Sequence, residues 1–264
     1  MLATQLAWPG FLILCGFMSL MWIISVKVKD ASIVDRVWGL TFFLQMGYYT
    51  YASPFSLRAT IVLALVGIWA LRLSWHIQTR NSSHGEDYRY QALRKRTGPN
   101  FWIISLFSVF LLQGALSFIV GLPLLLIASE SHGSSLGMLD YLGIAIWTCG
   151  FLCEAVADLQ LRKFKSDPNN KGKLLTTGLW SLTRHPNYFG DALLWWGVFV
   201  ISLSLPYGYL GVIGPIAMTF FLTKVTGVSL LEKSLIKKKP AYRDYILNTP
   251  AFIPRISNLW KAKY

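Results

Sequence analysis

Charged residues are scarce in this sequence. Only 14% of its 264 residues are Asp, Glu, Lys or Arg, against roughly a quarter in an ordinary soluble domain. Hydrophobic residues make up 54% of the chain, and the mean hydropathy is +0.46. The low charge excludes an ordinary soluble protein and predicts an integral membrane protein, in which the 11 Trp residues suit the membrane interfaces.

Several familiar site patterns are also missing. The sequence has no G-x-G-x-x-G between a strand and a helix, no Walker loop, no G-x-S-x-G and no H-E-x-x-H. No histidine or second cysteine pair completes a metal site, so we expect no metal and interpret the three cysteines as packing residues: Cys15, Cys149 and Cys153. A nucleotide would therefore have to be held by loops and span ends, where Arg and Lys meet its phosphates.

Acidic residues are outnumbered by basic ones, 12 against 25, and the net charge is +13. We expect no nucleic-acid partner, because the basic residues gather in the gaps between apolar runs. Seven runs are candidate membrane spans, of which the second is short and the fourth is interrupted by Gly121 and Pro123. The predicted spans are 8–28, 38–53, 58–78, 103–129, 139–159, 187–204 and 207–229.

Lys and Arg are concentrated in alternate gaps between these runs. The positive-inside rule then predicts an N-terminus outside and a C-terminus in the cytosol. Without an internal repeat or a long linker, the chain is expected to form one all-α transmembrane domain over residues 1–264. A bacterial inner membrane and the endoplasmic reticulum both fit this pattern.

Acidic residues inside spans are costly and often mark a functional cavity. Glu154 and Asp158 lie four residues apart, so they share one helix face, which continues toward Arg162 and Lys165. An interfacial position would explain a single acid. Two acids and two bases on one helix face favour a functional site.

A second polar row begins in the stretch LTRHPNYFGDALLWWG. Pro186 suits the first turn of a helix, with Thr183 or His185 as a cap. Three side chains then follow at four-residue steps on one face: Asn187, Asp191 and Trp195. An amide, a carboxylate and an indole along a cavity suit a ring-bearing polar cofactor, while His185 fits a capping role as well as a catalytic one.

Two other polar positions allow a structural and a functional interpretation. Asp35 precedes Arg36 at the start of the second span, where an interfacial ion pair is the structural alternative. Lys224, at the cytosolic end of the last span, can simply extend to the interface. The loop G-E-D-Y-R-Y also gathers polar side chains on the basic side, and its structural alternative is simple solvation: Glu86, Asp87, Arg89 and Tyr90.

The run G-L-W-S-L-T-R-H-P-N-Y-F-G-D resembles the C-terminal signature of the membrane steroid 5-alpha-reductases (3-oxo-5-alpha-steroid 4-dehydrogenases). More closely, the chain resembles the DUF1295 family. That likeness rests on S-x-V-D-R-V-W-G, R-L-S-W-H, G-E-D-Y-R-Y, T-R-H-P-N-Y-F-G-D and P-A-Y-R-D-Y…T-P-A-F-I-P, in this order. The R-H-P-x-Y-x-G core is shared with isoprenylcysteine and phospholipid methyltransferases, whereas N-Y-x-G-D is typical of the reductases.

The resemblance implies a reductase that transfers hydride from NADPH to an enone of a steroid-like or other lipid. Its lipid-soluble substrate would enter from the membrane. It places the cofactor half at about 139–264 and implies these cofactor-binding residues: Glu154, Asp158, Arg162, Lys165, Arg184, His185, Asn187, Tyr188, Asp191, Trp195 and Lys224. Glu154 departs from the family's Asn. Asp35 falls where the steroid enzymes bind a 3-oxo group, which makes it the expected catalytic residue: in its protonated form it would polarise the carbonyl. Trp69 falls where they keep a catalytic Tyr, so the proton donor is not evident.

Two other functional classes stay open. An S-adenosylmethionine-dependent methyltransferase would act on a lipid or lipidated substrate, and its cofactor needs no phosphate-binding cations. Those methyltransferases carry a Glu pair in the last helix, where this chain has the single Glu232. A non-enzymatic membrane protein would use its acids only at the interface.

Overall fold

The computed structural model describes residues 2–81, 85–130, 135–225, 227–228, 231–232, 235–236 and 239–255. This part of the chain contains helices and no strand, which confirms the all-α class. Two compact units form: the first comprises 1–140 and 202–214, and the second comprises 141–201 and 215–264. Positions 226 and 229 of the last predicted span lie outside the described residues.

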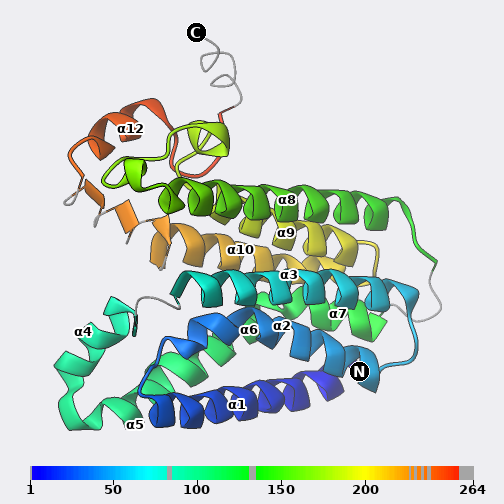
Figure 1. Cartoon of the computed structure of the whole chain (residues 1–264). Coiled ribbons are helices and arrows are strands. Elements are labelled where there is room, and N and C mark those ends of the chain that lie inside the picture. The colour runs from blue at the N-terminus through cyan, green and yellow to red at the C-terminus, as the bar shows by residue number, and fades with distance from the viewer. Residues whose placement is uncertain are drawn as a thin grey trace. The chain divides into compact units, whose positions relative to one another are not determined.

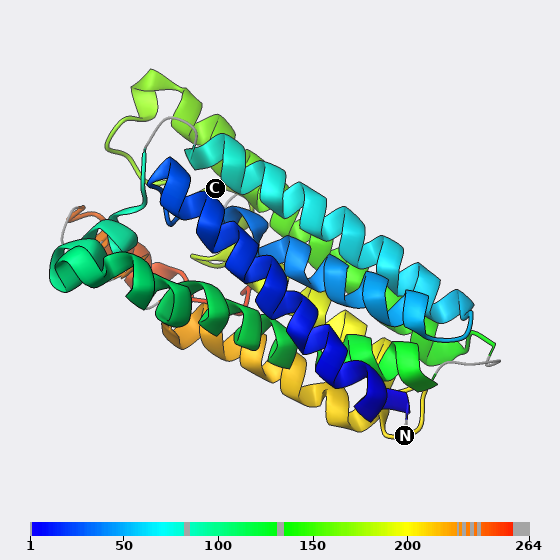
Figure 2. The ribbon, with the colours of Figure 1, turned by 90° about the horizontal axis from the view of Figure 1, so that it is seen from below.

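The first unit is built around α2, which packs against α1, α3 and α7. Figures 1 and 2 show α2 running beside both α1 and α3. The helices of this unit are α1 (Leu2–Val28), α2 (Ile33–Ala52), α3 (Leu57–Asn81), α4 (Tyr88–Thr97), α5 (Phe101–Ser105), a π-helical segment (Leu106–Leu111), α6 (Leu112–Val120) and α7 (Leu122–Glu130). The predicted interruption of the fourth run is confirmed, because Gly121 caps α6 and separates it from α7.

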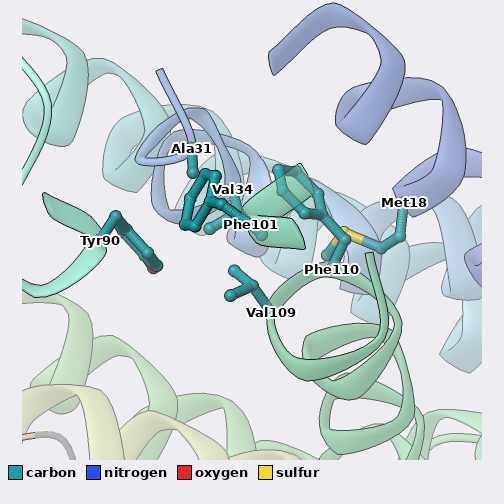
Figure 3. Close-up of a cluster of buried hydrophobic side chains, with 7 residues drawn as sticks. All are labelled: Met18, Ala31, Val34, Tyr90, Phe101, Val109 and Phe110. Carbon is teal, nitrogen blue, oxygen red and sulfur yellow. The ribbon is translucent and has the colours of Figure 1, made fainter. Parts of the chain in front are cut away.

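An apolar cluster within this unit fixes α4 beside the start of α2. Figure 3 shows its seven side chains: Met18, Ala31, Val34, Tyr90, Phe101, Val109 and Phe110. They come from α1, the α1–α2 turn, α2, α4, α5 and the π-helical segment. Because Tyr90 belongs to this buried cluster, the loop that precedes α4 is held against α2.

The second unit consists mainly of α8 (Met138–Ser166), α9 (Pro186–Ser202), α10 (Ile213–Phe220) and α12 (Tyr242–Asn248). Figure 1 shows α8, α9 and α10 side by side. A hydrogen bond from Trp196 Nε1 to Thr219 Oγ1, 3.3 Å long, joins α9 to α10. A π-helical turn, Phe221–Val225, follows α10 and contains Lys224.

Glycines allow α8 and α9 to approach closely. A Cβ atom on Gly150 would lie 2.5 Å from Leu194 N, and one on Gly190 would lie 2.5 Å from Glu154 N. Gly143 and Gly197 repeat this contact along the same pair of helices. Small residues at such crossings let two membrane helices pack backbone to backbone. The contact therefore places the acidic stretch of α8 next to the beginning of α9.

We expect Gly150→Ala and Gly190→Ala each to destabilise the protein by about 1–3 kcal/mol, because the added methyl group meets backbone rather than a movable side chain. Unfolding of the detergent-purified variants measures the change. Gly16→Ala is the matched control, since a Cβ there meets nothing within 4 Å in α1. Equal stability of all three variants would contradict this close packing.

Among the residues that the structure describes, five stretches are long and apolar enough to cross a membrane: Leu2–Val28, Leu57–Arg80, Tyr88–Val120, Met138–Ser166 and Gly208–Val225. This supports the membrane assignment. The helices at the second and sixth predicted runs, α2 and α9, do not meet the same measure of length and hydropathy. The count of seven spans and the orientation of the termini therefore stay predictions.

Candidate functional site

The T-R-H-P motif lies at the beginning of α9. The helix begins at Pro186, as predicted, and Phe189 N donates to the carbonyl of His185 over 3.0 Å. Thr183 accepts from His185 N, so its hydroxyl orders the residue before the helix. Proline suits this position because a first-turn residue has no intrahelical partner for an N–H group.

The C-terminal motif T-P-A-F-I-P runs beside this turn. Arg184 N donates to Pro250 O, and Arg255 N donates to Leu182 O, each over 2.9 Å. Thr183 Oγ1 also donates to Phe252 O over 2.9 Å. Two motifs that lie far apart in the sequence thus form one hydrogen-bonded structure in the second unit.

Two residues of the T-R-H-P motif belong to a cluster of charged side chains. Arg184 binds both carboxylate oxygens of Glu232, at 2.7 and 3.1 Å, and His185 Nε2 lies 3.1 Å from Oε1 of the same group. Arg184 Nη1 also donates to the carbonyls of Ile246 and Thr249 at the end of α12. Arg184 and His185 are both buried, so within the protein they position Glu232 and α12.

The same contacts set the protonation of this cluster. Burial alone would raise the pKa of Glu232, but hydrogen bonds from His185 and Arg184 lower it from 4.5 to about 2. For Arg184, burial would lower the pKa, yet the bonds to Glu232 raise it above its usual value. Tyr242, whose hydroxyl donates to Glu232, has a raised pKa because of burial and this carboxylate. The cluster therefore holds a carboxylate and a guanidinium in their charged forms.

Buried carboxylates line the α8–α9 contact. Asn187 Nδ2 donates to Asp158 Oδ1 over 3.1 Å. Glu154, Asp158 and Asp191 are only 3%, 5% and 7% exposed, and Trp195 is fully buried. The two polar rows predicted on separate helices are thus brought together at the asparagine–aspartate bond. The contact of α8 with α9 thus buries three acids, and their role in a functional site stays a prediction.

The other predicted cofactor residues are more exposed. Arg162 and Lys165 lie exposed in the last turns of α8, and Lys224 is exposed in the π-helical turn. Tyr188 is half-buried and stacks on His185, with ring centroids 5.6 Å apart. The roles of these residues in cofactor binding stay predictions.

Asp35 lies in the first unit in a hydrogen-bonded group. Tyr90 donates its hydroxyl to Asp35 Oδ1 over 2.8 Å, and Arg89 Nη2 donates to Oδ2 over 2.5 Å. The suggested pairing with Arg36 is wrong, because Arg36 binds Asp30 over 2.7 Å. Arg36, the next residue in the sequence, pairs with Asp30 instead, and the partners of Asp35 come from the first turn of α4.

The alternative of a simply solvated G-E-D-Y-R-Y loop is also wrong. Glu86 accepts from Ala31 N over 2.9 Å and from Arg94 Nη2 over 2.7 Å. Asp87 caps α4 by accepting from Arg89 N over 2.9 Å. Burial would raise the pKa of Asp87, but the bonds from Arg89 lower it. These contacts order the loop and place Tyr90 next to Asp35.

Sequence reasoning missed two residues of these groups. In the sequence, Tyr90 appears only as part of a charged loop, and its bond to Asp35 is not evident. Trp69, at the position where the related enzymes keep a Tyr, packs its ring against Phe42. Glu232 was noted only as a single acid. The signal available for Tyr90 was its place in a motif that also contains Arg89. For Glu232, nothing in the spacing pointed to Arg184.

Long apolar helices that bury acids, together with the hydrogen-bonded T-R-H-P motif, are the features of a helical membrane protein. The chain belongs to the family described as "Protein of unknown function (DUF1295)", which matches residues 21–249. This confirms the family resemblance, and with it the relation to steroid 5-alpha-reductase-like proteins.

Two relatives show how far this similarity extends. An uncharacterized protein of Schizosaccharomyces pombe is 25% identical over 273 residues, covering 90% of this chain and 76% of the relative. The "Probable O-methyltransferase ustE" of Ustilaginoidea virens is 39% identical over 66 residues, covering 25% of this chain and 23% of that protein. No solved structure matches the chain.

Proposed function

We propose that this protein is a membrane-bound reductase that uses NADPH to reduce the activated C=C bond of an enone lipid. The observation that carries the proposal is the Asn187–Asp158 hydrogen bond, which joins the polar faces of two apolar helices. Buried Glu154 and Asp191 lie on the same helices. Reductases of the related superfamily have an Asn before the aromatic residue and an acid after the Gly, as this chain has.

The donor set suits the polar end of a nicotinamide cofactor. Carboxylates of Asp158 and Asp191 can accept from ribose hydroxyls and a carboxamide, and Asn187 can both donate and accept. Arg162 and Lys165 continue from Asp158 toward the exposed end of α8, where cations suit phosphates. When bound, NADPH supplies the hydride. The residues named here hold and orient it.

We also propose that Asp35 meets a carbonyl of the substrate, a role that concerns the first unit alone. The Tyr90 hydroxyl donates its one proton to Asp35, so Tyr90 positions this carboxylate. Asp35 accepts from Tyr90 and from Arg89, which keeps the tyrosine hydroxyl fixed in one direction. The matched test is Tyr90→Phe, which removes the donor but keeps the ring in its apolar cluster.

Cofactor binding to the detergent-purified protein tests the proposal. At about 100 times Kd, a ligand adds about 2.7 kcal/mol of stability, which raises Tm by roughly 5–10 °C. We expect this shift with NADPH and not with S-adenosylmethionine. Asp191→Asn should abolish it, because an amide cannot replace the carboxylate as a double acceptor. Asp167→Asn, in an exposed turn, is the control and should keep the shift.

A second candidate is an S-adenosylmethionine-dependent methyltransferase, favoured by the 66-residue similarity to the "Probable O-methyltransferase ustE". Against it, the single Glu232 binds Arg184 and His185. A Tm shift with S-adenosylmethionine alone would replace the reductase proposal by this one. Absence of a shift with every cofactor would support a non-enzymatic protein.

A further inference from the structure

A cavity of about 980 Å³ lies in the second unit between the segment 172–181 and α12. Its size is at the upper end of the roughly 300–1,000 Å³ typical of small-molecule sites. Three basic side chains, two hydroxyl groups and one acid are among those lining it: Lys173, Lys239, Arg255, Thr176, Ser181 and Asp244. None of these residues is among the predicted cofactor-binding positions.

The wall of the cavity is held in place by hydrogen bonds. Lys239 Nζ donates to Lys173 O over 2.6 Å, which joins the two sides. Tyr245 donates its hydroxyl to Trp180 O, and Trp180 Nε1 donates to Ala157 O over 3.1 Å. The cavity wall is thereby attached to α8 at the residue before Asp158.

The charge of the cavity selects an anion. Three cations face one carboxylate, that of Asp244. Among the residues that the structure describes, Lys173, Lys239 and Arg255 form no ion pair with a carboxylate. Elsewhere in the chain the cations near α2 and α4 are neutralised by acids: Arg36, Arg89 and Arg94. These three cations therefore give the cavity a surplus of positive charge.

We infer that this cavity binds a terminal phosphate ester. A phosphomonoester carries close to two negative charges and three acceptor oxygens, which matches two ammonium groups and a guanidinium. The hydroxyl of Thr176 is an additional donor. A single carboxylate ligand would leave most of this positive charge uncompensated. The phosphate can belong to a nucleotide or to a lipid headgroup, and the inference does not depend on the proposed reduction.

Titration calorimetry on the full-length protein in detergent tests the site. The nucleotide probe is adenosine 2′,5′-bisphosphate, compared with adenosine, which carries no phosphate. The lipid probe is nanodiscs that contain phosphatidate, compared with nanodiscs of phosphatidylcholine. We expect Lys173→Gln and Arg255→Gln each to weaken binding of the phosphate-bearing probe at least about tenfold. Lys163→Gln, an exposed cation of α8 that does not line the cavity, is the matched control.

Asp244→Asn provides a change of opposite sign. Removing the one carboxylate should tighten phosphate binding severalfold, because a like charge no longer faces the ligand. Loss of stability cannot produce tighter binding, so this variant separates the site from a folding defect.

The two probes distinguish the sources of the phosphate. Binding of the bisphosphate that depends on Lys173 and Arg255 supports a nucleotide site, even if NADPH gives no Tm shift through Asp191. The same dependence for phosphatidate alone supports a lipid-headgroup site. Binding that is equal in the wild type, Lys173→Gln and Arg255→Gln overturns the inference, as does absence of binding by both probes.

Discussion

Replacing Arg58 by Met is expected to destabilise the first unit by about 3–5 kcal/mol, because it leaves a buried carboxylate without its cation. Arg58 Nε and Nη2 donate to the two oxygens of Asp140 over 2.6 and 2.9 Å. The two side chains are only 3% and 1% exposed. Gly137 N and Ser204 Oγ donate to the same carboxylate over 2.7 and 3.1 Å, so its remaining lone pairs are also used.

A double variant separates the ion pair from simple packing. Arg58→Met with Asp140→Leu removes both charges and should recover much of the lost stability, since apolar residues of similar size can replace a buried pair. Arg36→Met is the exposed comparison. Its pair with Asp30 is about one-fifth exposed on each side and should contribute no more than about 1 kcal/mol. Chemical unfolding in detergent measures all three. Single and double variants of equal stability would show that the charges are not coupled.

Local patterns predicted the elements of this fold well. Pro186 begins α9 and Gly121 ends α6, as their backbone preferences require. The four-residue spacing correctly placed Glu154 and Asp158 on one buried face, because that spacing is a property of a single helix. Features decided within one helical turn are thus visible in the sequence.

Pairings between side chains that lie far apart in the sequence could not be predicted in this way. Asp35 lies 54 positions from Arg89, Arg184 lies 48 positions from Glu232, and each pairing depends on how helices pack. Sequence proximity suggested Arg36 as the cation that pairs with Asp35, whereas the structure pairs Asp35 with Arg89. The number of membrane spans is ambiguous for a similar reason. At 17 residues, α9 is shorter than the 18 residues required of a candidate span.

The choice between reductase and methyltransferase depends on a few such pairings. The R-H-P-x-Y-x-G core is common to both classes, and in this chain its Arg184 and His185 are bound to Glu232. Within the protein they position Glu232, and their predicted contacts with a cofactor stay predictions. Our proposal therefore assigns cofactor selection to the acid–amide row on α8 and α9. A binding test on Asp191 is therefore more informative than one on the shared motif.

Arg184→Met should be the most damaging substitution in the second unit, at about 3–5 kcal/mol. It removes the cation of Glu232 and also leaves the carbonyls of Ile246 and Thr249 without their donor. Because those carbonyls belong to the end of α12, we expect that helix to detach. Limited proteolysis should then cleave near α12 faster than in the wild type. Unchanged proteolysis and Tm would show that the cluster does not hold α12.

Glu232→Gln tests the charge of the same cluster through its pH dependence. The pKa of Glu232 is about 2 in the folded protein against 4.5 ordinarily, so its contribution to stability is fully present above about pH 4.5. As the pH falls from 4.5 toward 2, protonation removes that contribution. The wild type should therefore exceed Glu232→Gln in Tm at neutral pH, and the difference should shrink across this acid range. Parallel Tm curves for the wild type and Glu232→Gln would mean that Arg184 and His185 do not stabilise the charged carboxylate.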